Sequence, residues 1–161
     1  MHTNRQHVIE LARNWLNESR AVSEHIGNFS GHRIRATNEA ERQRLGEQLR
    51  ALRVQLLRFF VLEVDLLRQL RNLRGRYHHE LGTCTEMILE EHHYVLSNLS
   101  RAIEYCDADS AEDSDLDHPQ KLYFDAFYGY WCLLQDGTRS AIQLALPAFP
   151  SIRNREGTLA C

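Results

Sequence analysis

The chain lacks several features that define common protein classes. No uncharged apolar run approaches the roughly 20 residues that span a bilayer, and the N-terminus has no apolar segment typical of a secretion signal. Only three prolines and eight glycines occur in 161 residues, which disfavours a loop-rich all-β domain. We therefore expect one soluble, cytoplasmic domain over residues 1–161.

Common catalytic and cofactor motifs are missing as well. Cys84, Cys106, Cys132 and Cys161 form no CxxC pair, which argues against a zinc ribbon or thioredoxin-type site, and we expect reduced thiols. The sequence has no glycine-rich phosphate loop, no GxSxG and no HExxH. A net charge of −3 gives no overall attraction to nucleic acid. These absences favour a non-enzymatic protein that binds neither nucleic acid nor membrane.

Helical periodicity dominates what the sequence does contain. Apolar residues recur at spacings of three and four. The predicted helices span about 4–29, 38–74, 77–106 and 119–146. Asn38 with Glu41 resembles a capping box, and Pro119 suits a first helical turn. An acidic loop over 107–118 and a tail over 147–161 complete the chain. Long helices with mostly short connections predict an all-α, up-down-up-down four-helix bundle.

Two polar residues interrupt the predicted apolar stripes. Glu63 and His92 stand where the helical period predicts buried apolar side chains. Burying such groups costs on the order of several kcal/mol unless they are paired or coordinated. Residue counts from the turn between their helices place Phe59 and His92 at similar height, with Glu63 one turn away and within reach of His92. Ser19 and residues 134–138 fall near the same level. The sequence therefore predicts a polar middle layer.

One possibility is that one or both of these side chains are exposed. If both are buried, the polar pair has two interpretations. In one, it is a hydrogen-bonded pair that fixes helix register. In the other, it is the remnant of a metal site for iron or zinc, completed by His93, His25 or Asp136. Glu90-x-x-His93 has the spacing found in di-metal carboxylate bundles, but those sites need two such motifs and two more glutamates, so an exposed helix face explains it better. No nucleophile or oxyanion donor accompanies the pair, and no catalytic residue is predicted.

The fourth predicted helix is crowded with aromatic residues. Six of the nine residues in 123–131 are aromatic, and they cannot all face one core. Exposed aromatic side chains favour binding of a protein partner or a second copy of the chain. The alternative is that they cover the open end of the bundle or the acidic loop. The candidate interface residues are Tyr123, Phe127, Tyr130 and Trp131.

The second predicted helix is rich in arginine, and Lys121 is the only lysine in the chain. One interpretation is a solvated helix face. The alternative is a basic strip that binds an acidic partner or the acidic loop of this chain, because guanidinium groups suit carboxylates. The strip consists of Arg50, Arg53, Arg68 and Arg71.

Four segments resemble the hemerythrin-like (HHE) family of four-helix bundles; they are residues 16–22, 59–67, 88–96 and 144–148. In this resemblance Glu63 and His92 match iron-ligand positions. Ser19 and Phe59 stand where the family has histidines, and the fourth helix lacks the expected histidine and carboxylate. Two matched positions fall short of the roughly five protein ligands of a di-iron site. The resemblance implies a scaffold that has lost most iron ligands, with a metal-binding sensor or oxygen-binding protein as the alternative.

A second, weaker resemblance involves residues 15–16, 28–31 and 59–70. These segments are similar to the Rsd/AlgQ family of bacterial regulators, which sequester the primary sigma factor of RNA polymerase. This resemblance implies binding of a polymerase subunit but identifies no binding residue. The leading prediction is a non-enzymatic regulatory or protein-interaction bundle.

Overall fold

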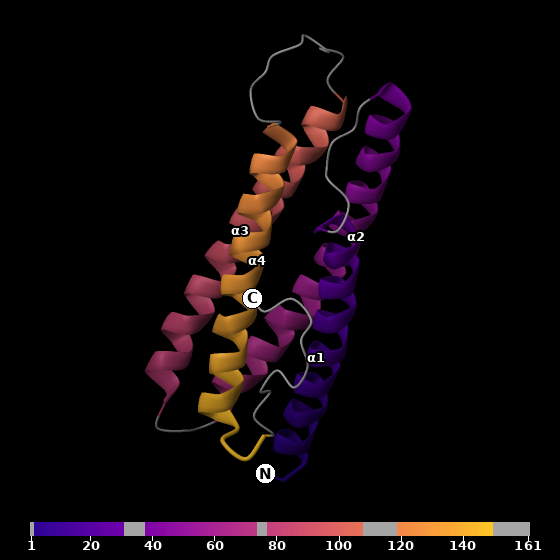
Figure 1. Ribbon diagram of the computed structural model, residues 1–161. Helices are drawn as coiled ribbons and strands as arrows, with labels where there is room; N and C mark the ends of the chain where they lie inside the picture. The colour runs from indigo at the N-terminus through magenta and orange to yellow at the C-terminus, as the bar shows by residue number, and fades with distance from the viewer. Residues whose placement is uncertain (1, 31–37, 74–76, 108–118, 150–161) are drawn as a thin grey trace.

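The structure, a computed structural model, describes residues 2–30, 38–73, 77–107 and 119–149. These residues form four helices and no strand. The helices are α1 (His2–Ser30), α2 (Glu39–Asn72), α3 (His78–Asp107) and α4 (Pro119–Ala145). Successive helices run in opposite directions (Figure 1). The predicted all-α four-helix bundle is therefore confirmed, whereas most of the acidic loop and of the tail lies outside the described residues.

The helix ends follow the signals in the sequence. All four helices begin and end within two residues of the predicted bounds. The Asn38 side chain accepts a hydrogen bond from the backbone N–H of Glu41 at 2.9 Å, which satisfies one of the free donors at the start of α2. At the other end of the chain, Pro147 has no N–H to continue the helix, and α4 ends at Ala145.

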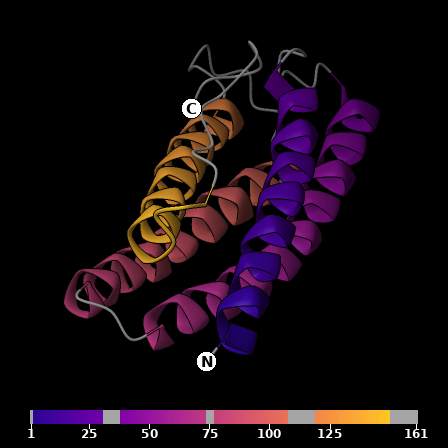
Figure 2. The same cartoon turned by 90° about the horizontal axis from the view of Figure 1, so that it is seen from below.

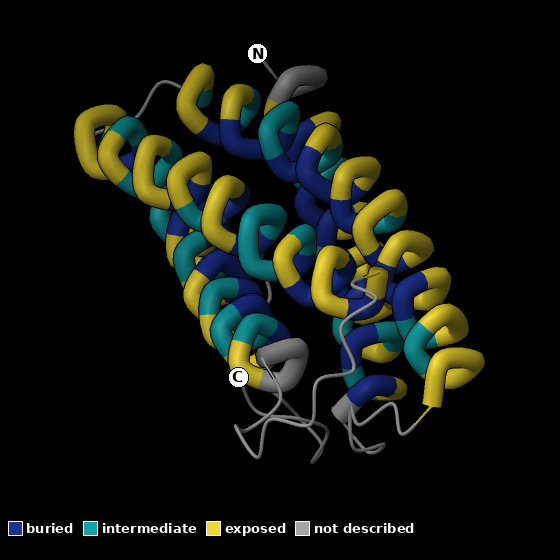
Figure 3. The backbone as a smooth tube through the Cα atoms, turned by 90° about the horizontal axis from the view of Figure 1, so that it is seen from above, coloured by how far each residue is buried: buried dark blue, intermediate teal, exposed yellow. Residues whose placement is uncertain are grey.

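The core is formed by one apolar face of each helix (Figure 3). Each fully buried Leu, Phe or similar side chain contributes about 1.5–3 kcal/mol relative to an exposed one. Two indole rings, those of Trp15 and Trp131, are the largest fully buried side chains. Phe59 lies between them, with ring centroids 6.0 Å from Trp15 and 5.3 Å from Trp131. Large rings therefore occupy the middle of the bundle.

The helices do not pack with equal closeness. Figure 2 shows α4 beside α3 and α1 beside α2. Among the helix pairs whose backbones approach each other, the α3–α4 pair has the most extensive approach and the α1–α4 pair the least. Gly137 permits the close α3–α4 contact, because a Cβ at this position would lie 3.2 Å from Cγ1 of Ile88. Between α1 and α4, long side chains make the contact instead; Trp131 donates a hydrogen bond to Ser23 at 3.3 Å.

Candidate functional site

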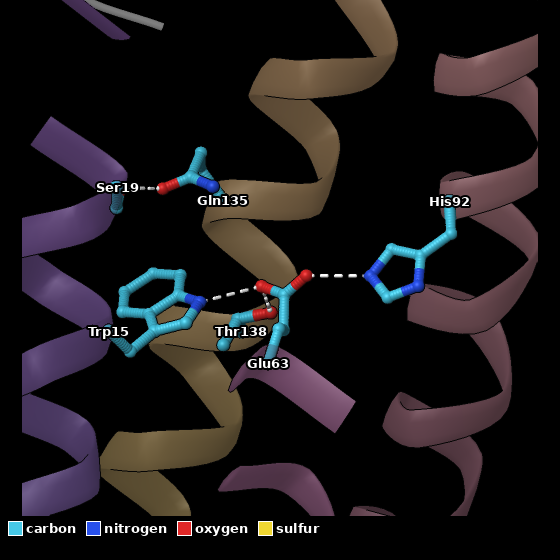
Figure 4. Close-up of polar contacts among 6 residues, drawn as sticks. All are labelled: Trp15, Ser19, Glu63, His92, Gln135 and Thr138. Carbon is cyan, nitrogen blue, oxygen red and sulfur yellow. Dashed lines mark hydrogen bonds and ion pairs between the residues drawn. The ribbon is translucent and has the colours of Figure 1, made fainter. Parts of the chain in front are cut away.

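A single carboxylate joins all four helices at the middle of the bundle. Glu63 of α2 is fully buried. Its Oε1 accepts hydrogen bonds from Trp15 Nε1 of α1 and Thr138 Oγ1 of α4, both at 2.8 Å. Its Oε2 lies 2.7 Å from His92 Nε2 of α3 (Figure 4). Because a carboxylate only accepts hydrogen bonds, His92 donates from Nε2. The predicted contact between Glu63 and His92 is confirmed.

Aromatic rings hold this contact in place. The Phe60 ring stacks on the His92 ring, with centroids 3.9 Å apart and planes 14° from parallel. His92 is buried but retains a small exposed edge. Phe59, which precedes Phe60, packs against Trp15 and so helps to orient the indole that donates to Glu63. Apolar walls of this kind strengthen the hydrogen bonds that they enclose, because they exclude water.

A second polar contact lies above the carboxylate in Figure 4. Ser19 of α1 donates a hydrogen bond to Oε1 of Gln135 of α4, and both residues are buried. The predicted position of Ser19 and of residues 134–138 in the polar layer is thereby confirmed. Gln135 Nε2 is buried without a partner among the described residues.

Sequence reasoning did not identify Trp15 and Thr138 as partners of Glu63. Trp15 fits the apolar stripe of the first helix, and the sequence gives no direct sign that its N–H meets a carboxylate. One signal was present, because a buried indole N–H generally requires an acceptor. Thr138 lies within the segment that the residue count placed at this level, but its role as a donor was not predicted.

The other suggested metal ligands do not join the pair. His93 and Asp136 are exposed, and Asp136 pairs with Arg139 at 3.4 Å. His25 Nδ1 lies 2.7 Å from Gln55 Oε1 in a separate contact. Within the described ranges no three His, Cys, Asp or Glu side chains gather in a geometry that could hold a metal ion. Glu90, like His93, is exposed, which agrees with the simpler interpretation of the ExxH spacing.

Two predicted interface residues are in the wrong place for a surface. Phe127 and Trp131 are fully buried, so the expectation that they form an outer contact surface is wrong. The reason is their spacing. Together with Phe124, Leu134 and Thr138 they recur every three or four residues, which places them on the core face of α4.

The other two predicted interface residues are half-buried against α3. Tyr123 stacks on Tyr105 with centroids 5.5 Å apart, and Tyr130 stacks on Tyr94 with centroids 4.9 Å apart. Arg101 lies over the Tyr123 ring, 5.4 Å from its centroid. These tyrosines therefore cover the α3–α4 seam, and a role in binding a partner stays a prediction.

The basic strip lies on the exposed side of α2. Arg50 forms an ion pair with Asp107, the first residue of the predicted acidic loop, and this contact raises the pKa of the Arg50 guanidinium. Arg53, Arg68 and Arg71 are exposed, and none of them forms an ion pair with another described residue. Asp107 is also the last residue of α3, and residues 108–118 lie outside the described part of the chain, so a contact between the strip and the acidic loop stays a prediction.

The outer side of α2 also carries apolar residues that the sequence analysis did not single out. Val54, Leu57 and Val61 are 51%, 45% and 73% exposed. They are spaced by three and four residues and share one side of the helix. We call these three residues the α2 outer stripe. Their spacing is visible in the sequence, but the inner apolar row of the same helix is longer.

The cysteines differ from the expectation of four reduced thiols. Cys84 and Cys106 are free, but Cys132 is disulfide-bonded, and Cys161 lies outside the described residues. Burial, together with the nearby Asp107 carboxylate, raises the pKa of Cys106 to about 11. A thiol with so high a pKa is a poor nucleophile at neutral pH.

Comparisons with known proteins add no family assignment. The chain matches no protein-family model, and searches of curated proteins and of solved structures found no significant match. The resemblances to the hemerythrin-like and Rsd/AlgQ families therefore stay predictions. In the described part of the chain no helix is both long and apolar enough to cross a membrane.

Proposed function

We propose that this chain is a non-enzymatic regulatory or protein-interaction bundle. The observation that carries the proposal is the display of large apolar side chains on the outside of three helices. Val54, Leu57 and Val61 of α2, Met87 of α3 and Leu133 of α4 are each at least 45% exposed. Single exposed apolar residues are ordinary, but a row of them along one helix is typical of a binding surface.

The buried centre of the bundle supports the same proposal. Both oxygens of Glu63 are engaged by donors from the other three helices. A carboxylate held in this way ties the helices together, and proton transfer to a substrate would require one of these contacts to open. We therefore assign Glu63 a structural role, with His92 as its partner.

A test combines partner capture with metal analysis of the same sample. The tagged full chain is purified from its own cells, and its bound proteins and metal content are measured together. The proposal expects one partner in a near-stoichiometric amount and only traces of metal. Recovery of polymerase sigma factor would identify the partner class that the Rsd/AlgQ resemblance implies. A chain recovered without partner, but with one metal ion that Glu63→Gln abolishes, would refute the proposal.

A metal-binding sensor is the second candidate, and one observation favours it. Glu63 and His92 bring a carboxylate oxygen and an imidazole nitrogen together in a buried site, and both are ligand types for iron and zinc. Two ligands would leave further coordination positions to other groups. Titration of the purified chain with Zn²⁺ or Fe²⁺ tests this candidate. It expects saturable binding of one ion, with a large loss of affinity in His92→Ala and no loss in His93→Ala.

A further inference from the structure

We propose that the α2 outer stripe binds an amphipathic helix of a partner protein whose apolar row is flanked by acidic residues. This inference rests on the proposed function and gives it a surface and a partner chemistry. The stripe is favoured over the other exposed apolar residues because it is continuous. Val64, half-buried, extends it by one further position at the same spacing.

The stripe has the spacing of a helix–helix seam. Val54, Leu57, Val61 and Val64 alternate in steps of three and four residues, which is the pattern that packs against an apolar row of a second helix. The core side of α2 carries a separate row, including Leu52, which is fully buried. α2 is therefore apolar on two sides. A surface helix normally has one apolar side, so its second row is available for a partner.

Arginines flank the stripe at both ends. Arg50 precedes Val54 by about one turn, and Arg53 is the residue immediately before Val54. Arg68 and Arg71 follow Val64 by one and two turns, on the same side of the helix. Three of these four guanidinium groups form no ion pair with another described residue. Guanidinium groups bind carboxylates through paired hydrogen bonds. The complementary partner therefore has Asp or Glu residues before and after its apolar row.

Charge argues against a second copy of this chain as the occupant. If two α2 helices paired in antiparallel fashion with Leu57 opposite Val61, Arg50 of each copy would face Arg68 of the other. A parallel pair would place every arginine opposite itself. Like charges in such positions destabilise helix pairs. An acidic helix meets no such repulsion.

The composition and narrow width of the stripe favour a partner helix over a lipid surface. Its exposed members are two valines and one leucine, and none is aromatic. Helices that lie on membranes more often insert Trp, Phe and Leu from a broad apolar face. A narrow β-branched row suits the groove of another helix better. Anionic vesicles nevertheless belong in the test, because arginines also attract phosphate headgroups.

The test uses fluorescence anisotropy with labelled helical peptides and the full chain. Each peptide is about 20 residues long, which is the length that covers the stripe and its flanking arginines. The first carries leucines at spacings of three and four with glutamates at both ends. The second has lysines in place of the glutamates, and the third has the leucines scrambled. We expect measurable affinity only for the first peptide, weakening as salt is added.

Two sets of variants locate the binding surface. Leu57→Gln with Val61→Gln changes exposed side chains and is expected to weaken binding at least about tenfold while helicity is retained. The matched control is Leu133→Gln, which alters a side chain that is 58% exposed on α4 and is expected to leave affinity unchanged. Arg53→Glu with Arg68→Glu provides an independent measurement, because it should reverse the preference toward the lysine peptide.

Several results would overturn the inference. They are equal binding of the acidic and lysine peptides, equal losses in the stripe variant and the Leu133 control, and stripe-dependent dimerisation of the chain in sedimentation. Stripe-dependent binding to phosphatidylglycerol vesicles, without binding to the acidic peptide, would also overturn it. The proposed function would survive these results if a partner still co-purified, because another surface would then carry the interaction.

Discussion

Replacing Glu63 by alanine should destabilise the bundle more than almost any other single change in its polar layer. The substitution removes the acceptor for Trp15 Nε1, Thr138 Oγ1 and His92 Nε2, and it opens a cavity at the centre. Each buried donor left without a partner costs about 1–3 kcal/mol. Water entering the cavity would recover part of this, which leaves a net loss of about 3–5 kcal/mol. Domains of this size have a total stability of about 5–15 kcal/mol.

The measurement is denaturant unfolding followed by far-UV circular dichroism, with the free energy of unfolding extrapolated to water. Glu47→Ala is the matched control, because it makes the same change at an exposed position of the same helix. We expect the control to change the free energy of unfolding by less than about 0.5 kcal/mol. If the two variants lowered the free energy of unfolding equally, Glu63 would not stabilise the contacts between the helices.

A second substitution at the same position separates hydrogen bonding from volume. In Glu63→Gln the amide oxygen can still accept from Trp15 and Thr138, and the amide N–H can donate to a neutral His92. We therefore expect a loss of about 1–2 kcal/mol, well below that of Glu63→Ala. A double-mutant cycle with His92→Ala should give a coupling energy of about 1–3 kcal/mol. If Gln were as damaging as Ala, the three contacts would not be what stabilises this layer.

Three further predictions concern other side chains. Trp131→Ala should lower the free energy of unfolding by about 3–5 kcal/mol, as measured by denaturation, because the ring is in the core. Burial, and then Glu90, raises the pKa of Glu91. The native state thus holds this proton more tightly than the unfolded state, so the contribution of Glu91 to stability falls as pH rises from about 4.5 through its folded pKa. Glu91→Gln should therefore stabilise the chain near pH 7 and flatten that pH dependence in unfolding titrations. Burial raises the pKa of Cys106 to about 11 and shields its thiol, whereas Cys84 is only half-buried. In native protein followed by mass spectrometry, Cys84 should therefore react with iodoacetamide much faster than Cys106.

The sequence was sufficient to predict the fold because local signals agree with one another. Four stripes of the same period, the Asn38 cap and Pro119 all indicate long helices, and the helix ends lie where these signals place them. The Glu63–His92 contact was also predictable, because residue counts from a short turn fix the relative height of two antiparallel helices. Both predictions follow from residue positions along the helices and do not require the orientations of the side chains.

The partners of Glu63 on α1 and α4 were harder to predict, because they depend on side-chain orientation. Residue counts placed residues 134–138 at the right level, but the direction of Thr138 and of the Trp15 indole depends on the rotation of each helix about its axis. Rotation is set by packing of large rings, here Phe59 between Trp15 and Trp131. The error at Phe127 and Trp131 has a different cause, because the aromatic composition suggested a surface although the spacing indicated the core.

The two roles proposed for α2 lie on different sides of the helix and can be tested separately. Glu63 is fully buried on the core side, whereas Val61 is 73% exposed on the outer side. A helix bound to the outer stripe would not reach the Glu63 carboxylate. We therefore expect Glu63→Gln to lower stability while leaving the affinity for the acidic peptide unchanged at temperatures where the chain remains folded. Leu57→Gln with Val61→Gln should do the reverse. If both variants changed both stability and peptide affinity, the Glu63 contacts and the outer stripe would be coupled through α2. The proposed division of roles between the two sides of α2 would then be wrong.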